Sequence, residues 1–515
     1  MLPLLAASLL LSASAFAAET PAVEPAKLFQ QYCMTCHGAD RLGSMGPALL
    51  PQNLERLKKA EALNVINSGR KATQMPAFGD KLTAAEIQAL ADYIYTPPTV
   101  EPNWQASDIK ASRISLAGAD QLPAKPVFKA DLKNLFIVVE GGDHHATLLD
   151  GDKLEPIHRF ATRFALHGGP KFSPDGRYVY FGSRDGWISK FDIWNLKTVA
   201  EIRAGINTRN VAVSNDGKWV LVGNYLPKTA VLLDADLNLQ RIYDITDSAG
   251  KSSRVSAVYD AGPRNSFILA LKDIPEVWEI SYDPKAEPVY KGLVHDYKQK
   301  EAIALPGQFT PREIVLDDIL DDFFFDQSYD HMIGASRSGK AQVVNLNVRR
   351  KIADLDLGGM PHLGSGITWD WHGTPVLASP NLKDGTVTII DMKTWKTVKQ
   401  IKTNGPGFFM RSHENTPYAW VDSMMSPASK DRLQIIDKQK LEVVGEVRPE
   451  PGKTLAHIEF TRDGKYALAS LWEDNGAIIV FDAATFKEIK RLPMSKPVGK
   501  YNVYNKTTRS AGTSH

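Results

Sequence analysis

The chain of 515 residues is too long for one compact core, so it predicts at least two domains. Its composition, with 43% hydrophobic and 23% charged residues, is that of a globular protein. The 61 basic residues nearly balance the 59 acidic residues, which argues against a nucleic-acid partner.

Residues 1–18 predict a signal peptide. The stretch is apolar, ends in an A-x-A pattern at Ala15-Phe16-Ala17, and is too short to span a membrane. A basic N-terminal region is missing, and a retained lipid-facing anchor is the alternative. No later stretch approaches eighteen consecutive apolar residues, so we expect no membrane span and a periplasmic location after export.

Residues 22–98 form the first predicted domain, in which helical patterns alternate with loops. Helical patterns cover residues 25–33, 62–69 and 82–96. In the last of them Thr83 precedes Glu86 by three residues, which is a capping box. The prolines of PPTVEPNW (97–104) then break the pattern, and we expect a linker over residues 99–124.

The only two cysteines, Cys33 and Cys36, form a C-x-x-C-H motif with His37, which is the attachment signature of a c-type haem. The thiols bind the macrocycle and the histidine supplies an axial nitrogen. A zinc site, which needs two further ligands, and a simple disulfide are the alternatives.

The second axial ligand is expected to be Met75, in the loop before the last helix, with Met45 as the alternative. This order of helix, attachment site, loop, methionine and helix resembles the all-α class I cytochromes c. The pattern therefore predicts one covalent haem c.

Residues 125–510 predict an all-β eight-bladed propeller. The segments 172–202, 213–242 and 460–492 share one plan of a D-G turn, an alternating strand, an apolar strand ending in Asp, and a last alternating strand. The residue ending the apolar strand recurs at intervals of 42 to 62 residues, the period of a propeller blade. These residues are Asp150, Asp192, Asp234, Asp283, Asn345, Asp391, Asp437 and Asp482. The longest interval indicates an insertion around residues 298–323, and a propeller that only binds proteins is the alternative at this stage.

The two predicted domains together resemble cytochrome cd1 nitrite reductase and its relatives over nearly the whole mature chain. The resemblance rests on the segments ALHGGPKFSPDGRYVYFGSRDG (165–186), NTRNVAVS (207–214), LGGMPHLGSG (357–366) and PVGKYNVYN (497–505). It implies that the propeller binds haem d1, a modified tetrapyrrole with an acrylate and free carboxylates. His167 matches the proximal axial ligand, and His362 matches one of two distal histidines that deliver protons to substrate. The other distal position is Phe325, which argues against nitrite reduction.

His457, in the segment 454–473, stands where the reductases have no histidine. This arrangement resembles the dihydro-haem d1 dehydrogenases of haem d1 biosynthesis, a sister family with the same two domains. The resemblance implies His167 and His457 as axial ligands of bound haem d1 or dihydro-haem d1. It also implies oxidation of a propionate side chain to the acrylate of haem d1, the last step of its biosynthesis, with electrons passed to the haem c. His362 is our candidate catalytic base, because neutral imidazole accepts a proton near neutral pH.

Further candidates for the haem d1 pocket lie beside the matching segments. Buried carboxylates need basic or hydrogen-bonding partners, and aromatic side chains can stack on the ring. The candidates are Arg163, Arg184, Arg209, Trp472, Lys500, Tyr501 and Tyr504. The basic ones are equally compatible with a solvated face or a blade-turn salt bridge. The isolated histidines are expected to be structural: His144, His145, His158, His295, His331, His372 and His413.

Two other functions stay open, a nitrite reductase with one distal histidine and a non-catalytic haem d1 carrier. The expected partners are the tetrapyrrole substrate, a soluble periplasmic electron acceptor, and cytochrome cd1 nitrite reductase as the recipient of haem d1.

Overall fold

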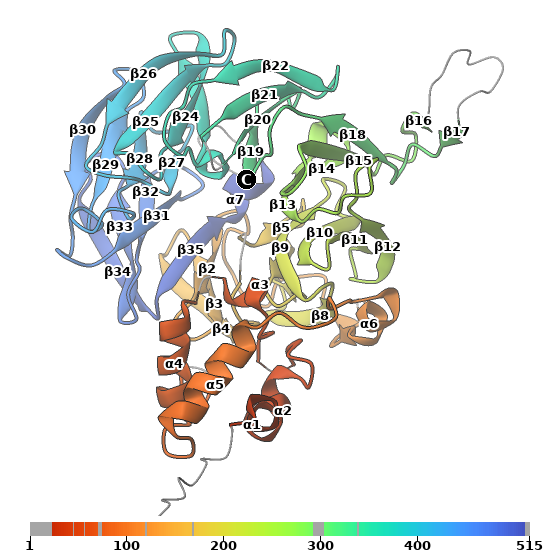
Figure 1. Ribbon diagram of the computed structural model, residues 1–515. Coiled ribbons are helices and arrows are strands. Elements are labelled where there is room, and N and C mark those ends of the chain that lie inside the picture. Colours follow the sequence, from red (N-terminus) through yellow and green to blue (C-terminus); the bar gives the residue numbers. More distant parts are fainter. Residues whose placement is uncertain are drawn as a thin grey trace, which may run out of the picture.

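The chain folds into a small helical domain followed by a large ring of β-sheets (Figure 1). The computed structural model describes residues 23–44, 46–55, 57–70, 75–118, 121–166, 169–291, 303–336 and 339–509. The predicted signal peptide, Met45 and His167 lie outside the described residues.

The helical domain forms where the sequence predicts it. Thr83 Oγ1 accepts a hydrogen bond from Glu86 N (3.3 Å), and Glu86 Oε2 accepts one from Thr83 N (2.7 Å), so the capping box is present. The preceding long helix stops at Gly69, whose φ of +70° suits a residue without Cβ. Phe29, Leu90 and their neighbours form the buried core between the helices. The helices are α1 (Pro25–Tyr32), α2 (Met34–His37), α3 (Pro51–Leu54), α4 (Lys59–Ser68) and α5 (Ala84–Tyr95).

The segment between the domains is ordered against the ring. Helix α6 (Ala106–Ala111) buries Ile109 in a cluster that includes Tyr180 and Ala200 of the second blade. Strand β1 (Ile114–Ser115) then pairs with the outer strand of that blade, with Ile114 opposite Glu201. The expected linker is therefore anchored along the edge of the ring.

The ring consists of eight antiparallel sheets, each built on four strands, as counted in the described part of the chain. From the innermost strand outward, the first blade consists of β35 (Pro497–Asn502), β2 (Leu135–Glu140), β3 (His145–Asp150) and β4 (Glu155–Ala161). The second blade consists of β5 (Lys171–Phe172), β6 (Tyr178–Gly182), β7 (Trp187–Asp192) and β8 (Lys197–Arg203), and the third of β9 (Asn207–Val213), β10 (Trp219–Leu226), β11 (Thr229–Asp234) and β12 (Leu239–Asp244). The fourth blade consists of β13 (Val255–Ala261), β14 (Ser266–Leu271), β15 (Glu276–Ser281) and β18 (Pro311–Val315). The fifth blade consists of β19 (Asp322–Phe325), β20 (His331–Ala335), β21 (Ala341–Asn345) and β22 (Arg350–Leu355). The sixth blade consists of β23 (Ile367–Trp371), β24 (Thr374–Pro380), β25 (Thr386–Asp391) and β26 (Lys396–Lys402), and the seventh of β27 (Met410–Ser412), β28 (Tyr418–Asp422), β29 (Leu433–Asp437) and β30 (Glu442–Val447). The eighth blade consists of β31 (Leu455–Phe460), β32 (Tyr466–Leu471), β33 (Gly476–Asp482) and β34 (Glu488–Met494).

The repeated residues, seven aspartates and Asn345, lie at or just after the end of the third strand of each blade, and their chemistry explains the repetition. Asp192 Oδ1 accepts from Trp194 N (3.0 Å), and Asp482 Oδ1 accepts from Thr485 N (2.8 Å). Such side-chain bonds to the backbone close the turn that leads into the outer strand. The predicted eight-bladed propeller is therefore confirmed.

The C-terminal strand closes the ring. Strand β35 pairs with β2, with Lys500 opposite Val138, so the first blade takes its innermost strand from the end of the chain. The short helix α7 (Val503–Thr507) follows and lies near the centre of the ring (Figure 1). Because β35 completes the first blade, every blade is flanked by two others and the ring has no terminal blade.

The insertion prediction is wrong in its extent. The structure inserts a hairpin of β16 (Val289–Lys291) and β17 (Ile303–Leu305) between β15 and β18, and this hairpin projects from the rim (Figure 1). Within the predicted insertion of 298–323, Pro311–Val315 is the outer strand of the fourth blade, and the next blade begins at Asp322. The sequence pattern did not indicate the outer strand β18, because the inserted hairpin separates it from β15 along the chain.

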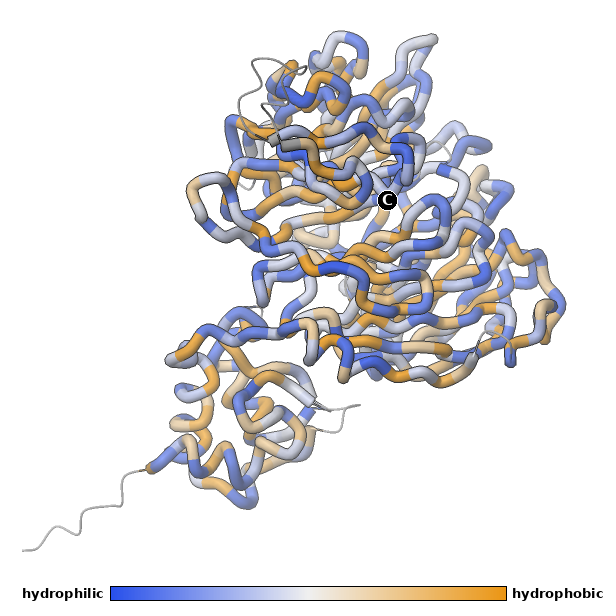
Figure 2. The backbone as a smooth tube through the Cα atoms, turned by 90° about the vertical axis from the view of Figure 1, so that its right-hand side faces the viewer, coloured by the Kyte–Doolittle hydropathy of each residue, from blue (hydrophilic) through white to orange (hydrophobic). Residues whose placement is uncertain are grey.

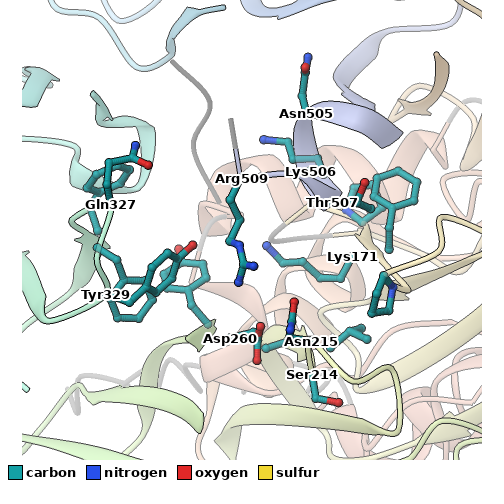
Figure 3. Close-up of a pocket in the computed structure, with 18 of the residues that line it drawn as sticks. Lys171, Ser214, Asn215, Asp260, Gln327, Tyr329, Asn505, Lys506, Thr507 and Arg509 are labelled. Carbon is teal, nitrogen blue, oxygen red and sulfur yellow. The ribbon is translucent and has the colours of Figure 1, made fainter. Parts of the chain in front are cut away.

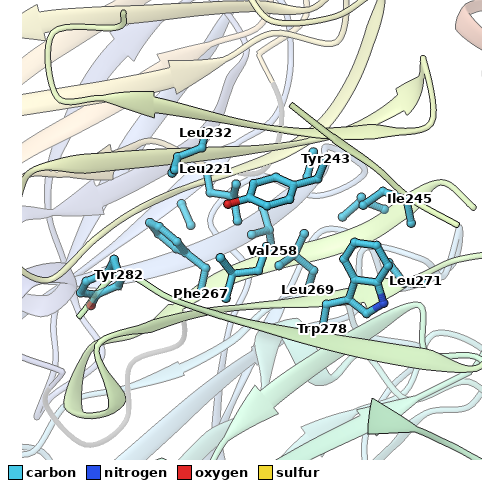
Figure 4. Close-up of a cluster of buried hydrophobic side chains, with 14 of the residues drawn as sticks. Leu221, Leu232, Tyr243, Ile245, Val258, Phe267, Leu269, Leu271, Trp278 and Tyr282 are labelled. Atoms are coloured by element: carbon cyan, nitrogen blue, oxygen red, sulfur yellow. The ribbon is translucent and has the colours of Figure 1, made fainter. Parts of the chain in front are cut away.

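Adjacent blades are held together by apolar side chains. Figure 4 shows one such cluster, in which Leu221 and Leu232 of the third blade face Phe267, Leu269 and Trp278 of the fourth. Figure 2 shows hydrophobic segments running through the ring. The helical domain lies to one side of the ring in the same view. None of the helices in the described ranges is long and apolar enough to cross a membrane.

Candidate functional site: a haem attachment turn and a propeller channel

The two cysteines and His37 lie on one tight turn. Helix α2 carries Cys36 and His37, and Cys33 directly precedes it. Both cysteines are free and half-buried. This contiguity is what covalent attachment of one haem requires, and no cluster of metal-binding side chains that would suit zinc occurs in the described ranges.

His37 is oriented for a ligand at Nε2. Its Nδ1 donates to the Pro47 carbonyl oxygen (2.8 Å), so the lone pair is at the other ring nitrogen. A Cβ on Gly46 would come within 2.8 Å of the imidazole, so only glycine lets the backbone approach the ring this closely. Burial lowers the pKa of His37, which keeps the imidazole neutral as a metal ligand must be.

Met75 lies at the edge of the same apolar core as Cys33. Both side chains are half-buried and pack against the cluster that contains Phe29, Phe78 and Leu90. The residues present therefore fit a haem c, with Cys33 and Cys36 as attachment points and His37 and Met75 as candidate axial ligands.

The loop that follows the attachment turn docks onto the propeller. Arg203 Nη1 donates to the Gly43 carbonyl oxygen (3.4 Å), and Nη2 contacts that of Leu42. Asn53 donates to the Ile206 carbonyl and Asn207 donates to the Gln52 carbonyl, each at 3.1 Å. The haem-bearing domain therefore contacts the connection between β8 and β9, at the N-terminal ends of the inner strands.

Aromatic rings form a continuous row along the propeller channel. The ring centroids are 4.1 Å apart for His362 and Phe408, 4.6 Å for Phe408 and Phe409, and 4.7 Å for Phe409 and His457. Tyr501 continues the row, 5.2 Å from His457. The row crosses four consecutive blades and offers an apolar wall of the kind that a flat macrocycle needs.

A β-bulge aims His457 into this row. The register of β31 against β32 shifts between Ala456 and Ile458, and His457 has a φ of +50°. A bulge re-aims a side chain, and a positive φ on a non-glycine residue is strained. Burial lowers the pKa of His457 well below its usual value, so the imidazole is neutral.

Lys500 and Asp422 fix the position of His457. Lys500 is fully buried, and its Nζ donates to Ser470 Oγ (2.9 Å) and lies 3.4 Å from His457 Nδ1, which leaves Nε2 for a ligand. Asp422 accepts from the backbone N–H groups of Phe408 (2.7 Å) and His457 (3.4 Å). Burial raises the pKa of Asp422 to about 6.

His362 lies at the other end of the row. Its Nδ1 donates to the Phe408 carbonyl oxygen (2.8 Å), so the lone pair is at Nε2. Burial lowers its pKa, nearby Asp322 opposes this shift, and the positive charges of Arg411 and Arg209 add to it. A neutral imidazole with a free lone pair is a competent proton acceptor.

Sequence reasoning missed Arg411, on the short inner strand β27. It is 3% exposed, Nη1 donates only to the Met410 carbonyl (2.7 Å), and Nε has no partner in the described part of the chain. Among the described residues no carboxylate comes within ion-pair distance, yet its charge lowers the pKa of both His362 and His457. Buried Glu459 and Asp422 act on the guanidinium from beyond ion-pair distance. A buried guanidinium without a close carboxylate fits an anionic ligand group. The sequence signal was the aromatic pair Phe408-Phe409, which Met410 separates from Arg411.

The other predicted pocket residues divide into two groups. Trp472 lies beside the row, 6.3 Å from Phe409, and Arg209 Nε donates to the Ser256 carbonyl (3.0 Å) on the neighbouring inner strand. Arg163 pairs with Glu201 (2.5 Å) and Tyr504 OH donates to Glu414 (3.1 Å), both away from the row.

The structure also brings the segments around Arg184 and His167 toward this region. Arg184 N donates to the Ala165 carbonyl (3.1 Å), two residues before His167. Two residues after His167, a Cβ on Gly169 would lie 2.8 Å from the ring of Tyr501. The described residues on either side of His167 therefore contact Arg184 and Tyr501.

Comparisons with known proteins agree with this architecture. A family model described as "Cytochrome D1 heme domain" matches residues 130–506, and one described as "Cytochrome C oxidase, cbb3-type, subunit III" matches residues 20–94. The chain therefore belongs to the cytochrome D1 haem domain family, with a c-type cytochrome domain in front of the haem d1 propeller.

Within this family, individual relatives differ widely in similarity. The "Dihydro-heme d1 dehydrogenase" of Pseudomonas aeruginosa is 51% identical over 99% of both chains. A solved structure of "Dihydro-heme d1 dehydrogenase NirN in complex with DHE", also 51% identical, superimposes with a TM-score of 0.88 over 94% of this chain and all of its own. The "Nitrite reductase" of Stutzerimonas stutzeri is 26% identical over 93% of this chain and 92% of its own. The predicted resemblance to the dehydrogenases is confirmed.

Proposed function

We propose that the protein is a dihydro-haem d1 dehydrogenase that oxidises the propionate side chain of the bound tetrapyrrole to an acrylate, the last step of haem d1 biosynthesis. The observation that supports this function is the row from His362 to His457, in which the proposed proton acceptor and the proposed iron ligand are joined by ring contacts. A nitrite reductase would need a second distal histidine, and the position that matches it is Phe325, a buried core residue. The 51% identity to a dehydrogenase over the full length favours the same choice.

The residues of this chain have separate roles in the proposed reaction. His362 accepts a proton from the side chain, and His167 and His457 hold the tetrapyrrole iron. Arg411 binds a carboxylate, assisted by the predicted pocket residues Arg209, Lys500 and Tyr501. The covalent haem c supplies a one-electron acceptor, held by Cys33, Cys36, His37 and Met75.

We also propose the cellular context. Residues 1–18 direct export to the periplasm, where haem c is attached. A soluble acceptor reoxidises the haem c between its two one-electron steps, and cytochrome cd1 nitrite reductase receives the finished haem d1. Residues 22–98, 99–124 and 125–510 act as cytochrome domain, linker and haem d1 domain.

The direct test is anaerobic incubation of the holo-cytochrome with dihydro-haem d1, followed by mass analysis of the extracted tetrapyrrole. We expect the loss of two hydrogens and matching reduction of the haem c. Tight binding with an unchanged mass would indicate a carrier, and the dehydrogenase would then be rejected.

Replacing His457 by Ala is expected to change the optical spectrum of the bound tetrapyrrole, because an axial imidazole is lost. The matched control is His413→Gln, since His413 is also fully buried but its Nδ1 accepts from Asn415 N (3.1 Å) outside the row. Identical spectra for His457→Ala and the unmodified protein would contradict ligation.

Replacing Arg203 by Met is expected to slow reduction of the haem c about three- to tenfold, because the contacts that position the attachment loop are lost. Tetrapyrrole affinity should not change. Stopped-flow absorbance of the haem c band measures the rate. Arg241→Met is the control, since Arg241 donates to the Phe309 carbonyl (2.8 Å) far from this interface. Equal rates in both variants would show that the docking contacts do not govern electron transfer.

A further inference from the structure

The proposed dehydrogenation releases two protons inside the propeller, and His362 can hold only one of them. Two C–H bonds of the side chain break, a C=C bond forms, and two electrons leave by way of the haem c to a soluble one-electron acceptor. The protons need a separate outlet, because the cytochrome domain covers part of one mouth of the channel. The inference that follows rests on the proposed function.

A cavity of about 160 Å³, lined by both polar and apolar side chains, lies at the opposite mouth of the channel. Its lining comes from the C-terminal ends of the inner strands, at Ser214, Tyr259 and Phe325, whereas the cytochrome domain contacts the N-terminal end of β9. Lys171, Lys506 and Arg509 reach into it, with Lys171 and Arg509 pointing toward one another (Figure 3). Exposed Asn215, Gln327 and Arg509 connect it with solvent.

Two side chains lie between His362 and this cavity. Asp322 begins β19, and its carboxylate lies against the turn after His362, since a Cβ on Gly364 would come within 2.0 Å of Asp322 Oδ2. Asp322 Oδ1 accepts a hydrogen bond from Tyr259 OH (2.9 Å), and Tyr259 itself lines the cavity. Lys171 Nζ is then 5.3 Å from the Tyr259 ring centroid. His362 precedes the sixth blade, and Asp322 and Tyr259 lie on the inner strands of the fifth and fourth blades. These three residues therefore form an arc from the candidate base to the far mouth.

We propose that Asp322 and Tyr259 relay protons from His362 to water in the far-mouth cavity. Each proton taken by His362 passes to the carboxylate, and the hydroxyl of Tyr259 passes a proton onward as it receives one, so both groups return to their starting state. The positive side chains around the cavity disfavour the reverse transfer of a proton into the channel.

The charges around His362 support this role for Asp322. The charged groups that act on His362 are Asp322, Arg411 and Arg209. The two arginines lower its pKa, whereas Asp322 and the hydrogen bond to the Phe408 carbonyl favour the imidazolium form. Asp322 itself faces Tyr259 and Lys171, and burial lowers the pKa of Lys171 to about 8. The carboxylate is therefore the one negative partner available to the protonated base among these groups.

The test compares Asp322→Asn and Tyr259→Phe with a matched control, Tyr282→Phe. Tyr282 OH also donates to a buried acid, Asp260 Oδ1 (2.8 Å), at the same end of the channel but away from His362. The holo-protein is mixed anaerobically with dihydro-haem d1, and the rate of haem c reduction is followed from acidic to neutral pH, because burial lowers the pKa of His362. In the unmodified protein the rate rises with pH through the pKa of His362, because only the neutral base accepts a proton.

Asp322→Asn is expected to lower the maximal rate about tenfold and to move the midpoint of the profile to lower pH, since the group that raises the pKa of His362 is lost. Tyr259→Phe should lower the rate with unchanged substrate affinity, and Tyr282→Phe should change neither quantity. If both relay variants keep the unmodified rate and profile while the unmodified protein removes two hydrogens, the relay is rejected. An unchanged tetrapyrrole mass in the unmodified protein would instead reject the dehydrogenase itself.

Discussion

Replacing His362 by Ala is expected to reduce turnover by about 10²- to 10⁴-fold, the range that a general base contributes. The imidazole is positioned by its bond to the Phe408 carbonyl, and burial keeps it neutral, so its Nε2 is ready to accept a proton. No other histidine of the aromatic row can replace it, because His457 lies at the far side of Phe409 and has its own role as a ligand. Product binding should change little.

Mass analysis of the extracted tetrapyrrole and the rate of haem c reduction measure this effect together. His158→Ala is the control, since His158 also stacks on an aromatic ring, Phe160 (5.9 Å), but lies on the outer strand β4. Full activity of His362→Ala would remove His362 from the mechanism, whereas loss of binding in that variant would make it a ligand-binding residue.

The propeller could be predicted because its repeated aspartates make hydrogen bonds to backbone groups only a few residues away. Each one closes a turn between the third and outer strands, so the requirement recurs in every blade and is visible in the sequence. The insertion could not be placed well, since a hairpin inserted before an outer strand leaves no such marker. The capping box of α5 and the glycine that ends α4 could also be predicted from the sequence, because both signals involve residues close together in the chain.

The geometry of the site was harder to predict from the sequence, because it depends on contacts between blades. Tyr501 lies in the row and Tyr504 does not, since β35 ends at Asn502, which caps α7 by accepting from Asn505 N (3.3 Å). The change from strand to helix turns Tyr504 toward Glu414 on the surface. The bulge that aims His457 into the channel likewise follows from pairing with β32 and leaves no pattern in the strand itself.

Replacing Arg411 is expected to have the second large effect, in which tetrapyrrole affinity falls while the stability of the ligand-free protein rises. Replacing Arg411 by Met should weaken tetrapyrrole binding about 10- to 100-fold, because a charged hydrogen bond to a buried carboxylate is lost. The same change should raise the stability of the ligand-free protein by about 1 kcal/mol, since a buried guanidinium that makes no ion pair with the described residues is replaced by an apolar side chain of similar length.

Equilibrium titration and thermal unfolding of the same preparation test both effects of Arg411→Met. Arg264→Met is the control, because Arg264 is a half-buried arginine that pairs with Glu279 (3.0 Å) in the fourth blade. That variant should lose stability and keep its affinity. A structural arginine would behave like Arg264, with lower stability and unchanged binding, so this outcome for Arg411 would show that its charge serves the fold. The expected opposite outcome would show that the ligand-free fold tolerates an unfavourable charge in the channel because the tetrapyrrole carboxylate compensates it.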